Sequence, residues 1–218
     1  MQRVLPLLID YSQNAFVPGH SITDNILLAQ ELLAGYNQKR LPLRCTIKVD
    51  IQKAYDSVEW DFLLEVLKLF NFPLQFIVLI NQCVSTASFS VSLNGSNHGF
   101  FKGGSGLRQG DPMSPYLFVL VMEIWNALLR FRVKNAAEFQ YHWKCKELGL
   151  KVNPAESQII FSRAVQQERQ QILEYLGFQE GSLPIKFLGI PLTSSRLTLT
   201  DCRPLFDKVD ARLAGWNH

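Results

Sequence analysis

Apolar residues recur at helical spacing in several stretches of the chain, and each stretch predicts a helix. The spacing predicts helices over residues 21–36, 57–70, 73–84, 113–130, 165–177 and 201–214. Ser21 suits the N-terminal cap of the first helix, and Asp56 suits that of the second. Pro73 suits a first helical position, and Gly177 suits a helix end. Helices are therefore expected to make up much of the fold.

Alternating polar and apolar residues predict strands between these helices. The stretch 44–50 predicts a strand, with Ile47 and Val49 alternating and Asp50 at its end, and 186–192 predicts another short strand. Residues 89–93 alternate strictly, Asn94-Gly95 is a signal for a type I′ turn, and the chain can return after it, which predicts a β-hairpin. Residues 1–20 and 131–148 follow neither pattern. The alternation of strands and helices indicates an α+β or α/β domain.

Composition places the chain among folded globular domains. It has 218 residues, 47% of them hydrophobic and 19% charged, which suits one domain, or one with a small appendage. A net charge of +3 is compatible with a nucleic-acid partner but too small to argue for one.

Cysteine usage and the apolar runs limit where the protein is expected to act. The four cysteines are scattered without a CxxC pair, which is typical of reduced thiols in a nuclear or cytosolic protein. No pattern of a secretory signal is visible, so secretion is not expected. The most apolar run, 116–122, is too short to span a bilayer, so a buried helix is the interpretation.

Asp50 is the first candidate for chemistry. It ends an apolar strand and a predicted helix follows, which is where open sheets place functional groups. An aspartate at this position can also simply cap a helix or shape a turn. These residues alone leave both interpretations open.

The glycine-containing stretch 106–115 is the second candidate. It precedes a predicted helix, so it offers backbone N–H groups and a helix N-terminus to a phosphate or a base pair. Without further context it can equally be a connecting loop.

The letters of these two stretches resemble one family. KVDIQKAYDSVEW at 48–60 and GLRQGDPMSPYLF at 106–118 resemble two palm motifs of the reverse transcriptases of LINE-type (non-LTR) retrotransposons. QNAFVPGHSITDN at 13–25, LPIKFLGIPL at 183–192 and LFDKVDARLAGW at 205–216 resemble other parts of the same domain, in the same order. The resemblance therefore covers nearly the whole chain.

This resemblance implies an α+β fold, the palm of a right-hand polymerase in which helices pack on an antiparallel sheet. Residues 1–150 would be partial fingers and palm, and 151–218 the palm segment after the active site with the start of the thumb. The implied partners are an RNA template and a DNA primer, without an obligate protein partner or a membrane. The implied cofactor is magnesium.

The resemblance also assigns roles around the first motif. Asp50, with the backbone carbonyl of Ile51, would bind the two magnesium ions, which prefer oxygen ligands. Tyr55 would stack under the incoming sugar and collide with a 2′-hydroxyl, so that deoxynucleotides are preferred; the alternative is a tyrosine packed in the core. Trp60 is interpreted as a core residue.

The second motif would contact the nascent base pair. The resemblance gives Gln109 and Gly110 the task of holding that pair and places Arg108 near the template or the triphosphate. Asp111 and Ser114 are expected to cap the helix that follows. Ser105 stands where the family usually has an arginine, which weakens any nucleic-acid contact there.

One part of the family's active site is missing from the sequence. The family carries a hairpin with two successive aspartates, and this chain contains no Asp-Asp pair. Residues 141–148 resemble the lead-in to that hairpin, whereas 150–154 resemble a stretch well beyond it, so the two are joined at Gly149–Leu150. An internal deletion or a mis-spliced gene model explains the junction. The basic residues that bind the triphosphate are expected upstream of Met1, and Glu156 replaces a usual lysine.

The loss predicts an inactive protein. Asp50 offers one carboxylate where two or three normally balance two divalent ions, and electrostatic stabilisation supplies most of the catalysis of phosphoryl transfer. The leading interpretation is an inactive remnant of a reverse transcriptase domain. A non-enzymatic nucleic-acid-binding or interaction module and a polymerase with a substituted site are the alternatives. The missing hairpin should also leave an edge of the strand before Asp50 unpaired, which predicts marginal stability.

Overall fold

The computed structural model describes residues 1–40, 44–135, 153, 155–162, 166–187, 190–195 and 198–214. These residues form two compact units. The first takes its residues from 1–20 and 51–152, and the second takes them from 21–50 and 153–218. Helices combine with small, mostly antiparallel sheets, so the predicted α+β class is confirmed.

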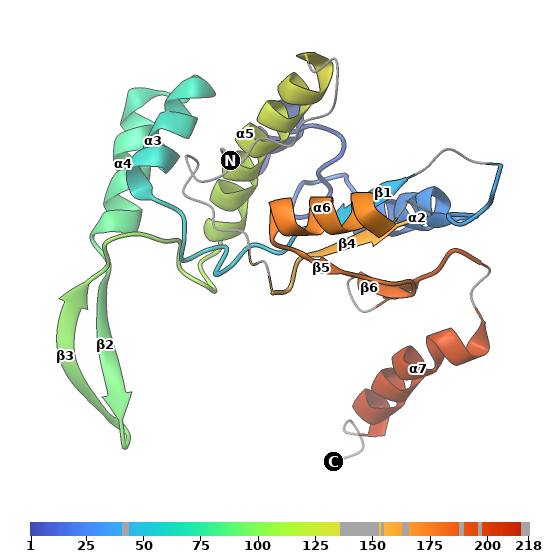
Figure 1. Ribbon diagram of the computed structural model, residues 1–218. Coiled ribbons are helices and arrows are strands. Elements are labelled where there is room, and N and C mark those ends of the chain that lie inside the picture. Colours follow the sequence, from blue (N-terminus) through green and yellow to red (C-terminus); the bar gives the residue numbers. More distant parts are fainter. Residues whose placement is uncertain are drawn as a thin grey trace. The chain divides into compact units, whose positions relative to one another are not determined.

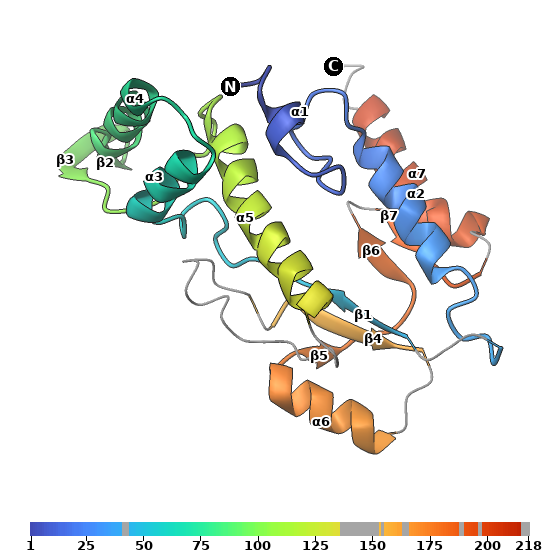
Figure 2. The same ribbon diagram turned by 90° about the horizontal axis from the view of Figure 1, so that it is seen from above.

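The first unit is built on helices α3 (Trp60–Leu69), α4 (Leu74–Ser85) and α5 (Ser114–Asn135), preceded by a single-turn helix α1 (Leu5–Leu8). Helix α3 packs on both α4 and α5 (Figure 2). The side chains of Leu63, Val66 and Leu67 on this helix are fully buried. Each such side chain stabilises the fold by about 1.5–3 kcal/mol relative to an exposed position. This cluster is the core of the unit.

A β-hairpin extends from the helices of the first unit (Figure 1). Strand β2 (Ser88–Leu93) pairs antiparallel with β3 (Ser96–Lys102). Asn94 and Gly95 both have positive φ, 50° and 80°, which is the backbone of a type I′ turn. The predicted hairpin is therefore confirmed.

The second unit contains a three-stranded sheet in the order β1 (Cys45–Lys48), β4 (Gln158–Phe161) and β5 (Gln179–Glu180). Strands β1 and β4 are antiparallel, with Ile47 opposite Ile159. Strands β6 (Ile185–Phe187) and β7 (Ile190–Leu192) form a separate antiparallel pair.

Helices α2 (Ile22–Leu33) and α6 (Gln166–Leu176) cover opposite faces of this sheet. The Tyr36 hydroxyl, just beyond α2, donates to the Ile160 carbonyl at 2.8 Å, and both residues belong to one buried cluster. Arg169 of α6 lies 5.7 Å over the ring of Phe161. Successive strand residues point to opposite faces, so the two helices flank β4 from both sides. Helix α7 (Leu199–Ala214) contacts β7.

Strand β1 is an edge strand in the described part of the chain. It pairs with β4 on one side, and no other strand among the described residues lies on its second side. The segments 141–148 and 150–152, which the sequence assigns to either side of the junction at Gly149–Leu150, fall outside the described residues.

Several predicted boundaries are wrong. The second helix begins at Trp60 rather than at residue 57, and Asp56 does not cap it, because Glu59 is its N-cap residue and makes no side-chain cap bond. The single strand predicted over 186–192 is two paired strands. The last helix begins at Leu199, and Pro73 is the N-cap residue of α4 rather than its first helical residue. Ser21 caps α2 as predicted, since its hydroxyl accepts from the N–H of Thr23 at 3.2 Å.

Candidate active site

The two sequence motifs meet inside the first unit. The backbone N–H of Leu107 donates to the Tyr55 carbonyl at 2.8 Å, and the N–H of Gly106 donates to the Val58 carbonyl at 2.8 Å. These bonds join the turn 52–58 to the loop that begins the second motif. The structure therefore brings Tyr55 and the Gln109 loop together.

Local backbone geometry explains why this turn is not helical. Lys53 has φ of 48°, in the left-handed region that a non-glycine residue rarely adopts. The Ser57 N–H donates to the Lys53 carbonyl at 2.9 Å and closes the turn. The carbonyls of Tyr55 and Val58 accept from the facing loop instead of from the N–H groups of a helical turn. Helix α3 starts only beyond them.

Trp60 forms a side-chain bond across the same junction. Its indole Nε1–H donates to the Gly106 carbonyl at 2.8 Å, and the ring is only partly buried. Gly106 has φ of 93°, and a Cβ there would lie 3.0 Å from the Asp56 Cα. Glycine is thus required by both conformation and space.

Tyr55 is held by packing as well as by its backbone. Its ring stacks on Phe118 of α5, with centroids 5.0 Å apart and planes inclined by 26°. Burial raises the pKa of the Tyr55 hydroxyl above its usual value of 10.0.

The predicted base-pair residues lie on the exposed part of the loop. Arg108, Gln109 and Gly110 are all exposed, and Gly110 has φ of 86°. The Arg108 guanidinium lies 3.6 Å from the Asp111 carboxylate. Asp111 in turn accepts from the N–H of Met113 at 2.8 Å and shapes the turn before α5. The helix begins at Ser114, so Ser114 is its first residue rather than its cap. The side chains of Arg108 and Gln109 are thus presented to solvent from a loop with fixed ends.

A cavity of about 550 Å³ lies beside this loop. Its wall combines aromatic side chains with glycine backbone and with charged groups: Asp56, Trp60, Val84, Phe89, Gly104, Ser105, Gly106, Leu107, Arg108 and Gln109. The volume is within the range of small-molecule sites.

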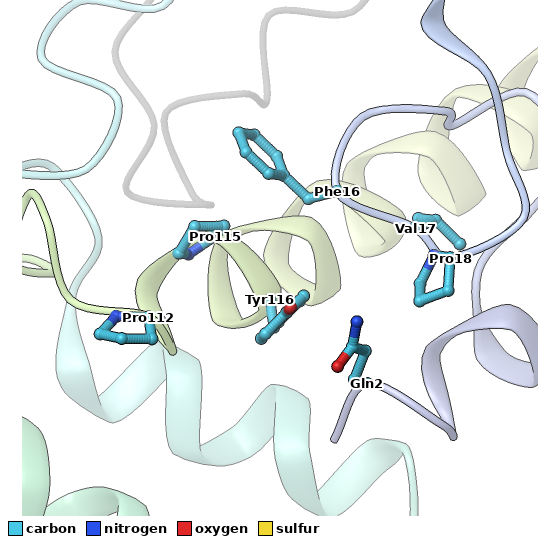
Figure 3. Close-up of a pocket in the computed structure, with 7 residues that line it drawn as sticks. All are labelled: Gln2, Phe16, Val17, Pro18, Pro112, Pro115 and Tyr116. Carbon is cyan, nitrogen blue, oxygen red and sulfur yellow. The ribbon is translucent and has the colours of Figure 1, made fainter.

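A second, smaller cavity lies where the N-terminal segment meets the start of α5 (Figure 3). It has a volume of about 260 Å³ and a mostly apolar lining: Gln2, Phe16, Val17, Pro18, Pro112, Pro115 and Tyr116. Phe16 is 55% exposed and has φ of 62°. The segment after it is held at His20, whose Nδ1 lies 2.7 Å from the Gln13 carbonyl and whose ring lies 4.9 Å from that of Tyr11.

Asp50 belongs to the second unit, two residues beyond the end of β1, and its side chain is partly buried. Its backbone is fixed on both sides, because its N–H donates to the Ser157 hydroxyl at 3.0 Å and its carbonyl accepts from the N–H of Asn153 at 2.8 Å. Ile51 begins the next segment of the first unit and packs against the core of that unit.

Among the described residues, the donor set around Asp50 does not fit a pair of magnesium ions. In the described ranges, no group of three or more histidine, cysteine, aspartate or glutamate side chains could hold a metal. Asp50 supplies one carboxylate and Ile51 one carbonyl, whereas a two-ion site needs carboxylates enough to offset two divalent charges.

Sequence reasoning misses two features of this site. The pattern assigns Trp60 to the core, whereas its N–H serves the second motif. Gly106 of the loop at 105–107 is visible in the sequence, but the bonds of this loop to residues 55–58 are not. An indole at the start of a helix is an ordinary core pattern, so the sequence carries no signal for the Trp60 bond.

Comparison with known proteins defines the class. A family model described as reverse transcriptase (RNA-dependent DNA polymerase) matches residues 1–141. The chain belongs to the reverse transcriptase family. Its relatives identify the type as that of the non-LTR retrotransposons.

Three relatives illustrate this type. An uncharacterized 149 kDa protein of transposon TX1 from Xenopus laevis is 32% identical over 133 residues, which are 61% of this chain and 10% of the relative. The Pol polyprotein of a type-1 retrotransposable element R2 from Nasonia vitripennis is 30% identical over 59% of this chain and 12% of its own length. That of a type-2 element from Drosophila melanogaster is 27% identical over 52% and 11%.

A plant sequence matches a shorter stretch. An uncharacterized mitochondrial protein of Arabidopsis thaliana is 50% identical over 38 residues, which are 17% of this chain and 31% of that protein. The chain spans about a tenth of the length of the three transposon relatives. No helix in the part of the chain that the structure describes is long and apolar enough to cross a membrane.

Proposed function

We propose that this chain is the palm segment of a non-LTR reverse transcriptase that keeps residues for the nucleotide and the template but does not catalyse DNA synthesis. The observation that carries the proposal is the sequence itself. Asp50, Tyr55 and Gln109 stand in their motifs, yet the chain contains no two successive aspartates.

The arrangement of elements supports a polymerase palm. Strand β1 leads to Asp50, the turn carrying Tyr55 follows, and the chain returns through β4 antiparallel to β1. The family's additional hairpin would pair with the free side of β1. That side has no partner strand among the residues the structure describes, which is the arrangement expected if this hairpin is lost at Gly149–Leu150.

The loop geometry supports the proposed substrate contacts. The ring of Tyr55 lies against α5, and the Tyr55 carbonyl is bonded to the second motif. The ring is therefore held in place and can pack under a sugar. Gln109 and Gly110 are exposed on the adjoining loop and are proposed to contact the base pair. Arg108 is proposed to contact a phosphate, which a guanidinium can bind with two parallel hydrogen bonds.

Lack of catalysis follows from charge. Transfer of a nucleotidyl group requires stabilisation of the developing negative charge, and this family achieves it with two cations held by several carboxylates. A single carboxylate at Asp50 leaves most of that cationic charge unbalanced. We propose that this chain therefore retains nucleic-acid binding although it has lost catalysis.

Binding to a labelled DNA primer annealed to an RNA template tests the retained contacts. We expect an affinity that falls as salt rises, because Lys and Arg contacts release counterions from phosphates. Replacing Arg108 with Ala should weaken binding about three- to tenfold and lower the salt dependence, whereas Lys68→Ala, on the exposed face of α3, should leave it unchanged.

The outcomes separate the candidate functions. Binding without primer extension supports the proposal. Extension that Asp50→Asn abolishes would instead establish a working polymerase. The absence of any salt-sensitive binding would remove the proposed contacts of Arg108 and Gln109.

A further inference from the structure

The junction between the two motifs depends on one side chain in particular. Two of its bonds, Gly106 N–H to Val58 and Leu107 N–H to Tyr55, use backbone atoms that any sequence supplies. The third is the 2.8 Å bond from the Trp60 indole to the Gly106 carbonyl. The Ser105 hydroxyl is 3.5 Å from the Asp56 carbonyl, which is at the limit of a hydrogen bond.

Trp60 connects the loop to helix α3. It is the first residue of α3, and that helix buries three side chains in the core of the unit. Its indole therefore extends from a rigid element to a loop whose next residues are exposed. Gly103 lies close to the same ring, since a Cβ added there would lie 3.6 Å from Trp60 and 3.1 Å from Phe89.

The bonded atoms are close in sequence to the predicted substrate contacts. Gly106 precedes Gln109 by three residues, and Leu107, which is 3% exposed, precedes it by two. Tyr55 supplies the carbonyl that receives the Leu107 N–H. A change at Gly106 thus alters the separation between the Tyr55 ring and the Gln109 side chain.

We propose that Trp60 is a positioning residue, which fixes the Gln109 loop against the Tyr55 turn through its indole N–H. Under the proposed function, on which this consequence rests, Trp60 thereby sets the preference for deoxynucleotides over ribonucleotides without touching either. The Tyr55 ring can exclude a nucleotide with a 2′-hydroxyl only if Gln109 holds the base pair at a fixed distance from that ring.

Native-state hydrogen exchange tests the positioning without any substrate. Trp60→Phe keeps an aromatic ring and removes the N–H. We expect exchange at the Gly106 and Leu107 amides to rise by about three- to tenfold, the effect of losing one hydrogen bond. Phe62→Leu, a packing change on the same helix, should not affect these two amides selectively.

Nucleotide selectivity tests the consequence. A chain-terminated primer on an RNA template is bound by the full chain, and its retention is measured with the complementary deoxynucleotide and with the matching ribonucleotide. Tyr55→Ala should remove the difference. Trp60→Phe should reduce the ratio at least about threefold, while binding of the primer–template alone changes less than about twofold.

The two readouts fail in different ways. Unchanged exchange at Gly106 and Leu107 in Trp60→Phe would overturn the positioning role, whatever the nucleotide result. Raised exchange with an unchanged selectivity ratio would overturn its link to sugar preference. If the unmodified chain retains primer equally with and without either nucleotide, the proposed nucleotide site fails, and exchange alone decides whether Trp60 holds the loop.

Discussion

Gly106 carries a structural requirement that its neighbours do not share. Its backbone has φ of 93°, and a Cβ would meet the Asp56 Cα at 3.0 Å and the Asp56 carbonyl oxygen at 3.1 Å. Both contacts are to backbone, which cannot move without shifting the whole turn. Gly104, two residues earlier, has open space around the position of its missing Cβ.

Gly106→Ala should therefore destabilise the first unit by about 1–3 kcal/mol, through strain and displacement of the turn. Urea denaturation followed by hydrogen exchange in α3 and α5 measures the change. Gly104→Ala is the matched control and should remain within about 0.5 kcal/mol of the unmodified chain. Equal losses in the two variants would contradict the structural requirement at Gly106.

Asp10 links the N-terminal segment to α5. The N–H and the hydroxyl of Ser12 both donate to the Asp10 carboxylate. The Arg130 guanidinium lies 2.6 Å from the same carboxylate. The Ser12 backbone bond, with smaller contributions from the Ser12 hydroxyl and Arg130, lowers the pKa of Asp10 below its usual 3.8.

A lowered pKa in the folded state stabilises the fold above the unfolded pKa, and this stabilisation is lost as pH falls through the folded value. Asp10→Asn should cost at most about 1 kcal/mol at pH 7, because Arg130 is largely exposed and solvent screens the pair. The cost should shrink below about pH 4. Urea midpoints at pH 7 and pH 3 measure it; a cost that grows on acidification would contradict the assignment.

The chemistry of some residues can be predicted from the sequence. Asp50, Tyr55 and Gln109 stand out because the family resemblance assigns them a role. Trp60 ends the first motif, but its bond is not predictable, because it depends on a loop 46 residues away in the chain. An analysis of hydrophobic periodicity counts Trp60 as an apolar residue, so it cannot predict a hydrogen bond from the indole N–H.

Among the helices and strands, local rules fail where distant backbone atoms compete. Asp56 followed by Glu59 is an ordinary helix-start pattern, yet α3 begins at Trp60. The carbonyls of Tyr55 and Val58 are bonded to the second motif instead. By contrast, the hairpin and α6 are set by local turn residues, and both agree with prediction.

The hairpin offers a direct test of such local control. Gly95 has φ of 80°, and no atom lies within 4 Å of the point that a Cβ would occupy, so only backbone strain opposes a substitution. Gly95→Ala should destabilise the hairpin by about 1 kcal/mol. Hydrogen exchange over 88–102 measures the effect, with Ser92→Ala as the strand control. An unaltered hairpin in Gly95→Ala would mean that the strands, rather than the turn, fix it.

The strand predicted over 186–192 is a case in which the local pattern gives the wrong result. The stretch reads as one apolar run, but Ile185 pairs with Leu192 across two short strands. Gly189 and Pro191 are signals for a break within this stretch, but a prediction from the apolar positions alone passes over them. The cluster with Tyr36 and Ile160 buries Ile185 and Leu192, which face each other at one end of this pair, and that contact is made by residues far away in the sequence.

For the molecule as a whole, one side of β1 has no partner strand among the described residues. Cys45 on this strand is exposed, and β4 is its sheet partner among the described residues. Unpaired strand edges promote association with other chains. The sequence predicts this edge through the junction at Gly149–Leu150, but not the division into two units, because that depends on which distant segments pack together.

We therefore expect marginal stability. Calorimetry should give a broad or stepwise melt with a van't Hoff enthalpy below the calorimetric one, and light scattering should detect association near the transition. A single sharp and reversible melt of a monomer would contradict this expectation.

Incorporation of a single labelled deoxynucleotide on an RNA template decides whether the chain has lost catalysis. The purified chain is mixed with an annealed DNA primer and with magnesium or manganese, beside Asp50→Asn and a complete non-LTR reverse transcriptase as the positive control. We expect no extended primer above the Asp50→Asn background, while the complete enzyme extends it. Extension by the unmodified chain that disappears in Asp50→Asn would contradict the proposed loss of catalysis.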